Sequence, residues 1–247
     1  MKYYFELNRK ITYIKNNEIT GVKMYNHTKN NGFTLAEVLI TLVIIGVIAA
    51  MTIPTLMNKT NNQELVSKLK KEYSTFSQAT NKIISEYGMP RGDIGGWATS
   101  TEDVYNLYKK YLNISKDCGS GTQCFEKMTS GNTFYRYLKG TNYFHSKFTS
   151  SDTYAVILAD GAQVLFSNNR TNCNRSEYST NNICNEIWID INGEKKPNQW
   201  GRDMFIFALK EDGLHPAGCD GSSADCNSSG NGWSCACKVL SENAMNY

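Results

Sequence analysis

The sequence predicts an α+β fold with a long N-terminal helix, membrane-spanning in its first half, packed on a C-terminal antiparallel sheet head with disulfide-stapled loops. Three observations lead to this prediction. An apolar stretch from Phe33 to Met57 contains Glu37 as its only formal charge. Apolar residues at helical spacing continue from there to about Tyr87, and strand patterns and eight cysteines follow in the rest of the chain.

The stretch from Phe33 to Met57 is long enough to cross a membrane. Its roughly 25 residues, at ~1.5 Å per residue, span a hydrocarbon core of about 30 Å. A removable secretory signal has a shorter apolar core, of roughly 7–15 residues, followed by a small-residue cleavage site. Here the polar residues Lys29 to Gly32 precede the stretch directly, and Ala49-Ala50-Met51 leads into further helix-compatible sequence. A single membrane-spanning helix is therefore predicted.

Glu37 needs a positive partner, because an ionisable group at membrane depth costs several kcal/mol unless it is paired. One interpretation is a plain membrane anchor that tolerates a glutamate near its cytoplasmic end. The other interpretation uses Glu37 to register one copy of the chain against another.

The string Gly32-Phe33-Thr34-Leu35-Ala36-Glu37, followed by apolar residues and Pro54, resembles the signal of type IV prepilins and type II secretion pseudopilins. The resemblance covers roughly residues 29 to 60. It implies that a membrane peptidase cuts between Gly32 and Phe33 and methylates the new amino terminus on Phe33. Gly32 suits this step because it leaves the scissile backbone unhindered. The implied organisation is a cleaved leader (1–32), a transmembrane and assembly half of the helix (33–57), and the helix continuation with one pilin-like head (58–247).

The leader is basic, which agrees with retention of that end in the cytoplasm. Its formal charge is +4 against +3 for the whole chain, so the remainder is close to neutral and gives no reason to expect nucleic-acid binding. Translation from Met24 instead of Met1 would give a shorter leader of about nine residues, and both starts are compatible with the sequence. The leader's charged residues are Lys2, Glu6, Arg9, Lys10, Lys15, Glu18, Lys23 and Lys29.

The helix is predicted to continue beyond the membrane stretch to about Tyr87. Pro54 removes one backbone donor and predicts a kink or a local loosening. Gly88-Met89-Pro90 ends the helix. The apolar positions that recur at spacings of three, four or seven are Leu65, Leu69, Tyr73, Phe76, Ile83 and Tyr87.

The remaining elements follow from shorter patterns. Residues 91–131 are expected to be rich in loops, with a short helix near 101–112. Asp160-Gly161 joins two apolar runs, 154–158 and 163–166, in a predicted hairpin. Two more strands are predicted over 186–191 and 203–208, and residues 238–247 form a last helix or strand.

All eight cysteines follow the membrane stretch, and an even number in an oxidising compartment predicts disulfides. Short separations favour Cys118 with Cys124 and Cys173 with Cys184, which leaves the last four to pair among themselves in any of several ways. Zinc is the alternative, but no C-x-x-C pair is present and the three histidines do not cluster with the cysteines. The last four cysteines are Cys219, Cys226, Cys235 and Cys237.

The loop between the last two predicted strands holds oxygen donors that calcium could use, namely Asp190, Asn192 and Asp203. Their spacing is not that of an EF-hand, and a structured turn at Asn192-Gly193 is the favoured interpretation. No other cofactor is indicated. The sequence has no G-x-S-x-G and no H-E-x-x-H motif, so we expect no enzyme.

The resemblance implies a structural subunit of a type II secretion pseudopilus or a type IV pilus. It would stand in the bacterial inner membrane as a single-pass protein, with its head in the periplasm or at the cell exterior, until it joins a filament. Its partners would be copies of itself or other pilins, the prepilin peptidase, the inner-membrane assembly platform and membrane lipid, with no nucleic acid. The alternative is a minor or competence pilin whose head binds DNA, a surface or a secreted cargo.

Overall fold

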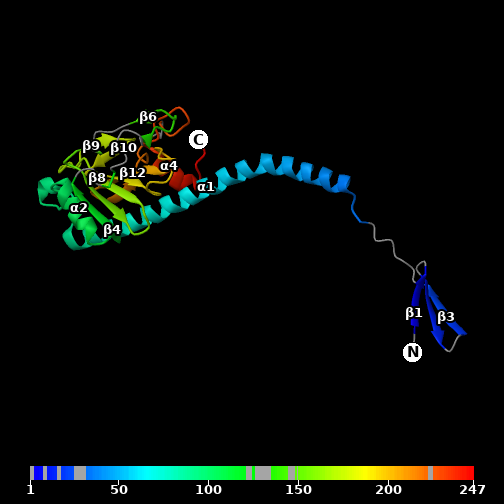
Figure 1. Cartoon of the computed structure of the whole chain (residues 1–247). Coiled ribbons are helices and arrows are strands. Elements are labelled where there is room, and N and C mark those ends of the chain that lie inside the picture. Colours follow the sequence, from blue (N-terminus) through cyan, green and yellow to red (C-terminus); the bar gives the residue numbers. More distant parts are fainter. Residues whose placement is uncertain are drawn as a thin grey trace. The chain divides into compact units, whose positions relative to one another are not determined.

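The computed structural model describes residues 3–7, 10–15, 18–24, 32–120, 124–125, 135–143, 148, 150–221 and 225–247. It consists of two units, Met1–Pro54 and Thr55–Tyr247, which are described in turn. Figure 1 shows their elements along the chain.

The first unit contains a three-stranded antiparallel sheet that sequence patterns did not predict. Its order is β1-β2-β3, with β1 at Tyr3–Leu7, β2 at Lys10–Lys15 and β3 at Glu18–Met24. These segments are rich in aromatic and β-branched residues, which favour strands.

Helix α1 spans Leu35–Tyr87, close to the predicted range. It continues through Pro54, so the proline does not end the helix. It ends where predicted, because Gly88 takes a left-handed conformation (φ +79°) and its N–H donates to the carbonyl of Ile84 at 2.9 Å. The indole of Trp97 then donates to the Gly88 carbonyl at 2.9 Å and covers this end of the helix.

The head is built on a six-stranded antiparallel sheet in the order β13-β12-β11-β8-β7-β4. The predicted hairpin is present as β7 (Tyr154–Leu158) and β8 (Gln163–Ser167), with Gly161 at φ +92° in its turn. The two further predicted strands are β11 (Asn185–Asp190) and β12 (Met204–Lys210). The edge strands β4 (Ile114–Ser120) and β13 (Gly213–Pro216) were not predicted.

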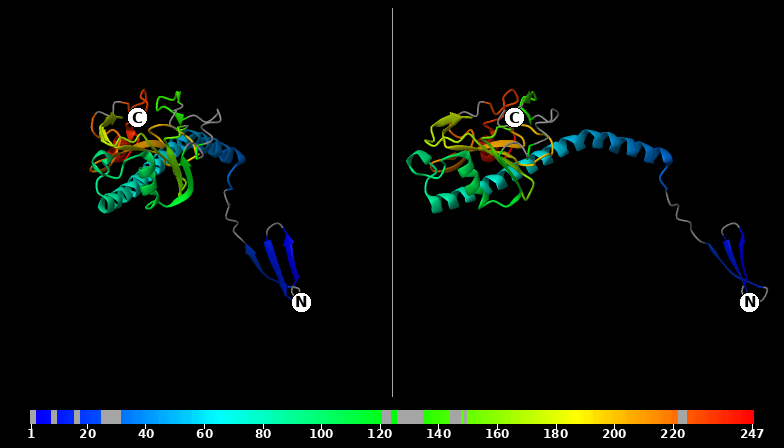
Figure 2. Two further views of the ribbon diagram at one scale, coloured as in Figure 1. Left: turned by 90° about the vertical axis from the view of Figure 1, so that its left-hand side faces the viewer. Right: turned by 60° about the vertical axis from the view of Figure 1, so that its left-hand side comes forward.

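The two faces of this sheet are covered differently. On one face, the second half of α1 buries Leu69, Phe76 and Ile83 completely, together with residues of α2 (Thr101–Lys109). On the other face, Trp188 and Trp200 are buried beneath loops. Alternation along β11 divides its side chains between the two cores, since Ile187 and Ile189 belong to the first and Trp188 to the second. Figures 1 and 2 show the helix on one side of the sheet and the loops on the other.

Smaller elements complete the head. A short 3-10 turn, η1 (Gly92–Ile94), precedes α2. Two two-stranded sheets lie outside the main one, β5 (Tyr135–Arg136) with β6 (Asn142–Tyr143) and β9 (Arg175–Glu177) with β10 (Thr180–Ile183). The final segment contains helix α4 at Cys235–Glu242.

Four disulfides hold the loops of the head. The first two are the local pairs favoured by sequence separation, Cys118–Cys124 and Cys173–Cys184. The last four cysteines pair as Cys219–Cys237 and Cys226–Cys235, so one bridge encloses the other. This nested arrangement ties the Gly-, Ser- and Asn-rich tail to α4.

Candidate functional site

The predicted processing junction is exposed. Gly32 and Phe33 precede α1, and the Phe33 side chain is 88% exposed. A Cβ placed on Gly32 would meet no atom within 4 Å, so the backbone is open there.

Glu37 and Thr34 form a reciprocal capping box at the start of α1. The carboxylate of Glu37 accepts hydrogen bonds from the backbone N–H and from the hydroxyl of Thr34, both at 2.8 Å. In return, the Glu37 N–H donates to the Thr34 hydroxyl at 3.2 Å. A Thr-x-x-Glu string before an apolar run is the sequence signature of this motif, and it could have revealed the box. The prediction for Glu37 considered only its charge.

The capping box gives the Thr34 and Glu37 groups hydrogen-bond partners, but it supplies no positive charge to the carboxylate of Glu37. Across the residues that the structure describes, no Lys, Arg or His pairs with this carboxylate. The predicted partner, an ammonium on Phe33 of another copy, would exist only after cleavage. The carboxylate is therefore positioned at the helix start without a cationic partner from the described part of the chain.

The first half of α1 presents apolar side chains in all directions. Within the described part of the chain, α1 is the one helix long and apolar enough to cross a membrane, and its most apolar window is not buried by the protein. A helix that is apolar all round requires lipid or other helices around it. The exposed apolar residues are Phe33, Leu35, Val38, Leu39, Ile40, Leu42, Val43, Ile44, Ile45, Val47, Ile48, Met51, Ile53, Leu56 and Met57.

Two of the three calcium candidates, Asp190 and Asp203, lie together beneath the loop that joins β11 to β12. Both are fully buried, and the backbone N–H of Ile191 donates to the Asp203 carbonyl at 2.9 Å. The Asp190 carboxylate accepts from the Tyr135 hydroxyl at 2.6 Å and from the Asn192 N–H at 3.1 Å.

The Asp203 carboxylate serves the same loop, because its two oxygens accept the N–H groups of Asn198 and Gln199, each at 2.6 Å. Asn192 uses its side-chain amide to bond the Lys196 carbonyl at 3.2 Å. Since N–H and O–H donors already point at these carboxylates, the donor set fits a structured turn better than a cage of calcium ligands. Calcium binding here stays a prediction.

Burial changes the acidity of this pair. Burial and the neighbouring Asp203 raise the pKa of Asp190 well above its usual value. Burial also raises the pKa of Asp203, to about 6, although the loop N–H groups oppose the shift. Two neighbouring buried carboxylates repel each other when both are ionised, so protonation of one of them stabilises the loop.

Four of the aromatic residues that the structure describes form part of the core. Tyr135 stacks on Phe148 with ring centroids 5.3 Å apart, and Trp188 meets Trp200 edge-on at 5.2 Å. These four side chains are almost completely buried. Their contacts stabilise the loop-covered face of the sheet.

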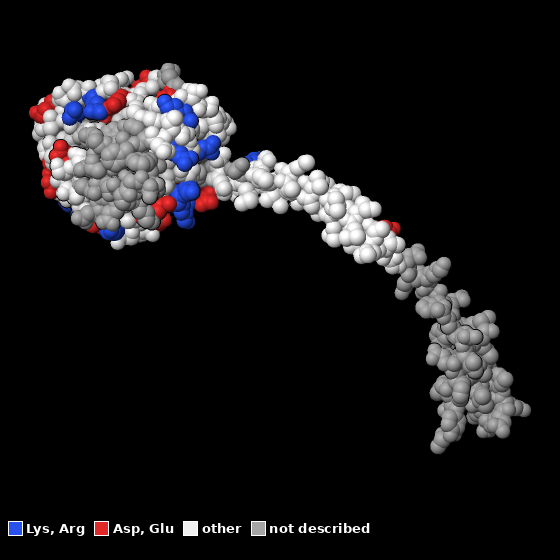
Figure 3. All heavy atoms as spheres, turned by 45° about the horizontal axis from the view of Figure 1, so that its top comes forward, with Lys and Arg blue, Asp and Glu red and all other residues white. Residues whose placement is uncertain are grey.

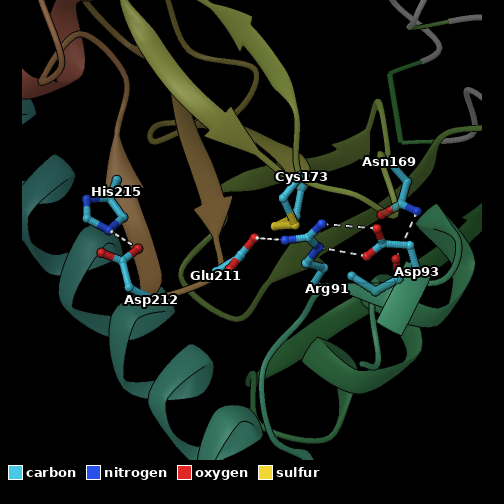
Figure 4. Close-up of a disulfide and its surroundings, with 9 residues drawn as sticks. Arg91, Asp93, Asn169, Cys173, Glu211, Asp212 and His215 are labelled. Atoms are coloured by element: carbon cyan, nitrogen blue, oxygen red, sulfur yellow. Dashed lines mark hydrogen bonds and ion pairs between the residues drawn. A yellow bond between two sulfur atoms is a disulfide. The ribbon is translucent and has the colours of Figure 1, made fainter. Parts of the chain in front are cut away.

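Figure 4 shows how charged residues join the loops around the Cys173–Cys184 disulfide. Arg91 donates to Asp93 at 2.8 Å and to Glu211 at 3.1 Å, linking the segment after α1 to the turn between β12 and β13. His215, on β13, pairs with Asp212 at 2.8 Å (Figure 4). The ion pair between Arg91 and Glu211 holds two separate segments of the head together.

Comparison with known proteins agrees with the amino-terminal geometry. The prokaryotic N-terminal methylation motif matches residues 27–53, so the chain carries a prepilin-type signal and is a type IV pilin-like protein. A family of unknown function, DUF6613, matches residues 55–230. This match covers more than half of the chain, and the protein therefore belongs to that family. No curated protein and no solved structure shows significant similarity to it.

Proposed function

We propose that this protein is a structural subunit of a helical filament, either a type II secretion pseudopilus or a type IV pilus. It waits in the bacterial inner membrane through the first half of α1, with the head in the periplasm or at the cell exterior, and an assembly platform moves it into the filament. The methylation motif and the exposed apolar helix support this proposal. Its work is mechanical, without an enzymatic reaction or a resident cofactor.

The observation that carries the proposal is the carboxylate of Glu37 on an apolar helix, which has no cationic partner among the residues that the structure describes. Prepilin peptidase would cut between Gly32 and Phe33 and methylate the new amino terminus. The ammonium created on Phe33 then becomes available to the Glu37 of a neighbouring subunit. Each charge is costly alone at membrane depth, and pairing them compensates part of that cost while fixing the axial position of one subunit against the next.

Three variants separate the charge of Glu37 from its role in the capping box. Glu37→Gln keeps a side chain that can cap the helix but removes the charge. Thr34→Val removes the capping hydroxyl and keeps the charge. Glu37→Ala removes both. We expect normal leader removal in all three by mass spectrometry of the amino terminus, and loss of most filament incorporation in both Glu37 variants.

Thr34→Val is the matched control, and we expect it to assemble with at most a several-fold loss. The loss of a cap costs only about 1 kcal/mol of helix stability. Wild-type filament yield from Glu37→Gln would refute the charge-pairing mechanism. A product that still begins at Met1 or Met24 would refute processing.

The alternative is a minor or competence pilin whose head binds DNA, a surface or a secreted cargo. The feature that favours it is the tail held by Cys219–Cys237 and Cys226–Cys235, which forms a disulfide-bonded loop on the head. Salt-dependent retention of DNA by the full-length protein, together with scarcity of the subunit in sheared filaments, would support this alternative. Abundant subunits without DNA retention would support a major structural role.

A further inference from the structure

A basic groove runs along the head beside the beginning of the head-bound part of α1. One wall comes from the helix, with Asn62, Glu64 and Lys68. The other comes from the loop between β11 and β12, with Lys195, Lys196 and Arg202. The groove is open and has a volume of about 780 Å³.

Four of the five charged side chains that line this groove are positive. Lys68, Lys195, Lys196 and Arg202 face a single acidic side chain, Glu64. Glu64 pairs with Lys68 at 2.9 Å and therefore offsets only one of the four charges. Lys195 and Lys196 are exposed, and Figure 3 shows Lys and Arg side chains grouped on the head near the place where α1 leaves it. The groove is suited to an anion.

Arg202 joins the two walls of the groove. Its guanidinium donates to the side-chain oxygen of Asn62 on α1 at 3.1 Å. A guanidinium has five donors, so this contact fixes its position and leaves others for a phosphate or carboxylate oxygen. The groove therefore combines one guanidinium held in a fixed position with the exposed ammonium groups of Lys195 and Lys196.

The position of the groove along α1 indicates the kind of anion. Asn61, which lines the groove, follows Met57 at the end of the apolar stretch by about one helical turn, and Lys68 follows Met57 by about three. At ~1.5 Å per residue these residues lie about 6 to 16 Å beyond the apolar stretch. The headgroup layer extends roughly 5–7 Å beyond each side of the hydrocarbon core, and lysine side chains reach several ångströms further. The groove therefore begins at the level of lipid phosphates.

We propose that this groove binds the phosphate of an anionic phospholipid headgroup and so holds the head at the membrane surface before the subunit enters a filament. This inference rests on the proposed membrane anchoring through α1. The position at headgroup level favours lipid over a carboxylate surface on a neighbouring subunit. Removal of the subunit from the membrane would empty the groove.

Native mass spectrometry of the full chain in detergent tests the proposal. The probes are dioctanoyl phosphatidylglycerol, dioctanoyl phosphatidylcholine and inorganic phosphate. We expect the anionic lipid to bind about tenfold more tightly than the zwitterionic one, and the Lys195→Ala/Lys196→Ala variant to lose about tenfold in affinity for it. The matched control is Lys82→Ala/Lys116→Ala, which removes two exposed lysines outside the groove and should leave binding unchanged.

Each other outcome overturns the proposal. Equal binding of both lipids, or an equal loss in the control variant, would show that the groove does not select the headgroup. Displacement of the lipid by an equal concentration of inorganic phosphate would show a site for free phosphate. Unchanged lipid binding with reduced filament yield in the groove variant would indicate a carboxylate on a neighbouring subunit.

Measurements of processing and assembly in the same variants distinguish failure of this inference from failure of the proposed function. Leader removal and filament yield are scored in every variant, and thermal unfolding confirms that the head is folded. A protein that binds the lipid but never assembles would support the groove and refute the filament role. A protein that assembles into filaments but does not select the anionic lipid would support the filament role and refute the lipid-binding groove.

Discussion

The two halves of α1 are parts of one continuous helix, yet they have opposite surroundings. In the first half, Val43 and Ile45 are 65% and 61% exposed. In the second half, Leu69, Phe76 and Ile83 are completely buried on the sheet. The first half is apolar on every side, whereas the second has an apolar stripe and a polar outer face. The difference teaches that the head buries the apolar side chains of only the second half of the helix. The apolar side chains of the first half need lipid or neighbouring helices to cover them.

Among the variants that test this difference between the two halves, Phe76→Ala is expected to change the stability of the head most. Phe76 is fully buried, with ring centroids 5.9 Å from Tyr108 and 6.4 Å from Phe207, so its loss leaves a cavity. We expect a decrease of about 3–5 kcal/mol in the free energy of unfolding of the head. Urea unfolding followed by tryptophan fluorescence measures it, because all the tryptophans lie beyond α1.

Val43→Ala is the matched control in the exposed half. It should leave the unfolding of the head unchanged, because this side chain makes no contribution to the buried core. A decrease similar to that of Phe76→Ala would contradict the division of α1 into two halves.

A smaller effect concerns Glu72, a buried acid on the head-bound half. Burial and the neighbouring Asp160 raise the pKa of Glu72 to about 7. Burial alone would raise the pKa of Asp160 too, but hydrogen bonds with Glu72 and Lys71 lower it to about 2. Lys71 is paired with both carboxylates. Between about pH 2 and pH 7 the proton therefore resides on Glu72 and the negative charge on Asp160.

The sign of the pH dependence follows from the raised pKa of Glu72. The folded state binds the proton more tightly than the unfolded state, whose pKa is near 4.5. Stability is therefore present below about pH 4.5 and is lost as the pH rises through about 7, by on the order of 2 kcal/mol. Glu72→Gln should flatten the profile of melting temperature between pH 5 and 8 in part, as measured by thermal unfolding.

Glu64→Gln, on an exposed part of the same helix, serves as the control for this profile. Its carboxyl has a lowered pKa because of Lys68 and does not titrate in that range. Asp190 and Asp203, whose pKa values are also raised, should supply the slope that remains in Glu72→Gln. An unchanged slope in Glu72→Gln would show that Glu72 does not hold the proton.

The smallest effect is expected from calcium. The carboxylates of Asp190 and Asp203 already accept hydrogen bonds from their own loop, so we expect millimolar calcium to leave the melting temperature of the wild type unchanged. A rise in melting temperature with calcium that disappears in Asp203→Asn would contradict this expectation and establish a calcium site in the loop between β11 and β12.

Periodicity made much of the fold predictable. The long helix, the β7–β8 hairpin, β11 and β12 have strong apolar patterns, and the structure confirms each of them. The edge strands were harder to predict. Strand β4, Ile114–Ser120, has few apolar residues and two register shifts against β7, and β13 is a short segment that ends at Pro216.

The candidate site was predictable in its residues but less so in their contacts. The motif from Gly32 to Glu37 is visible in the sequence, and the Thr-x-x-Glu spacing within it is the signature of the capping box. The approach of Asp190 to Asp203 depends on the pairing of β11 with β12, which places the ends of both strands together. The connectivity of the last four cysteines depends on how α4 packs, and no local spacing encodes it.

The capping box has one more consequence, for the maturation of the chain. Every group that builds it belongs to Thr34 or Glu37, and the peptide bond that carries the Thr34 N–H lies after the predicted cut. Cleavage at the predicted site would therefore remove none of the hydrogen bonds of this capping box. The uncleaved chain already has the helix start that a processed subunit would need, so processing would require no local refolding of α1.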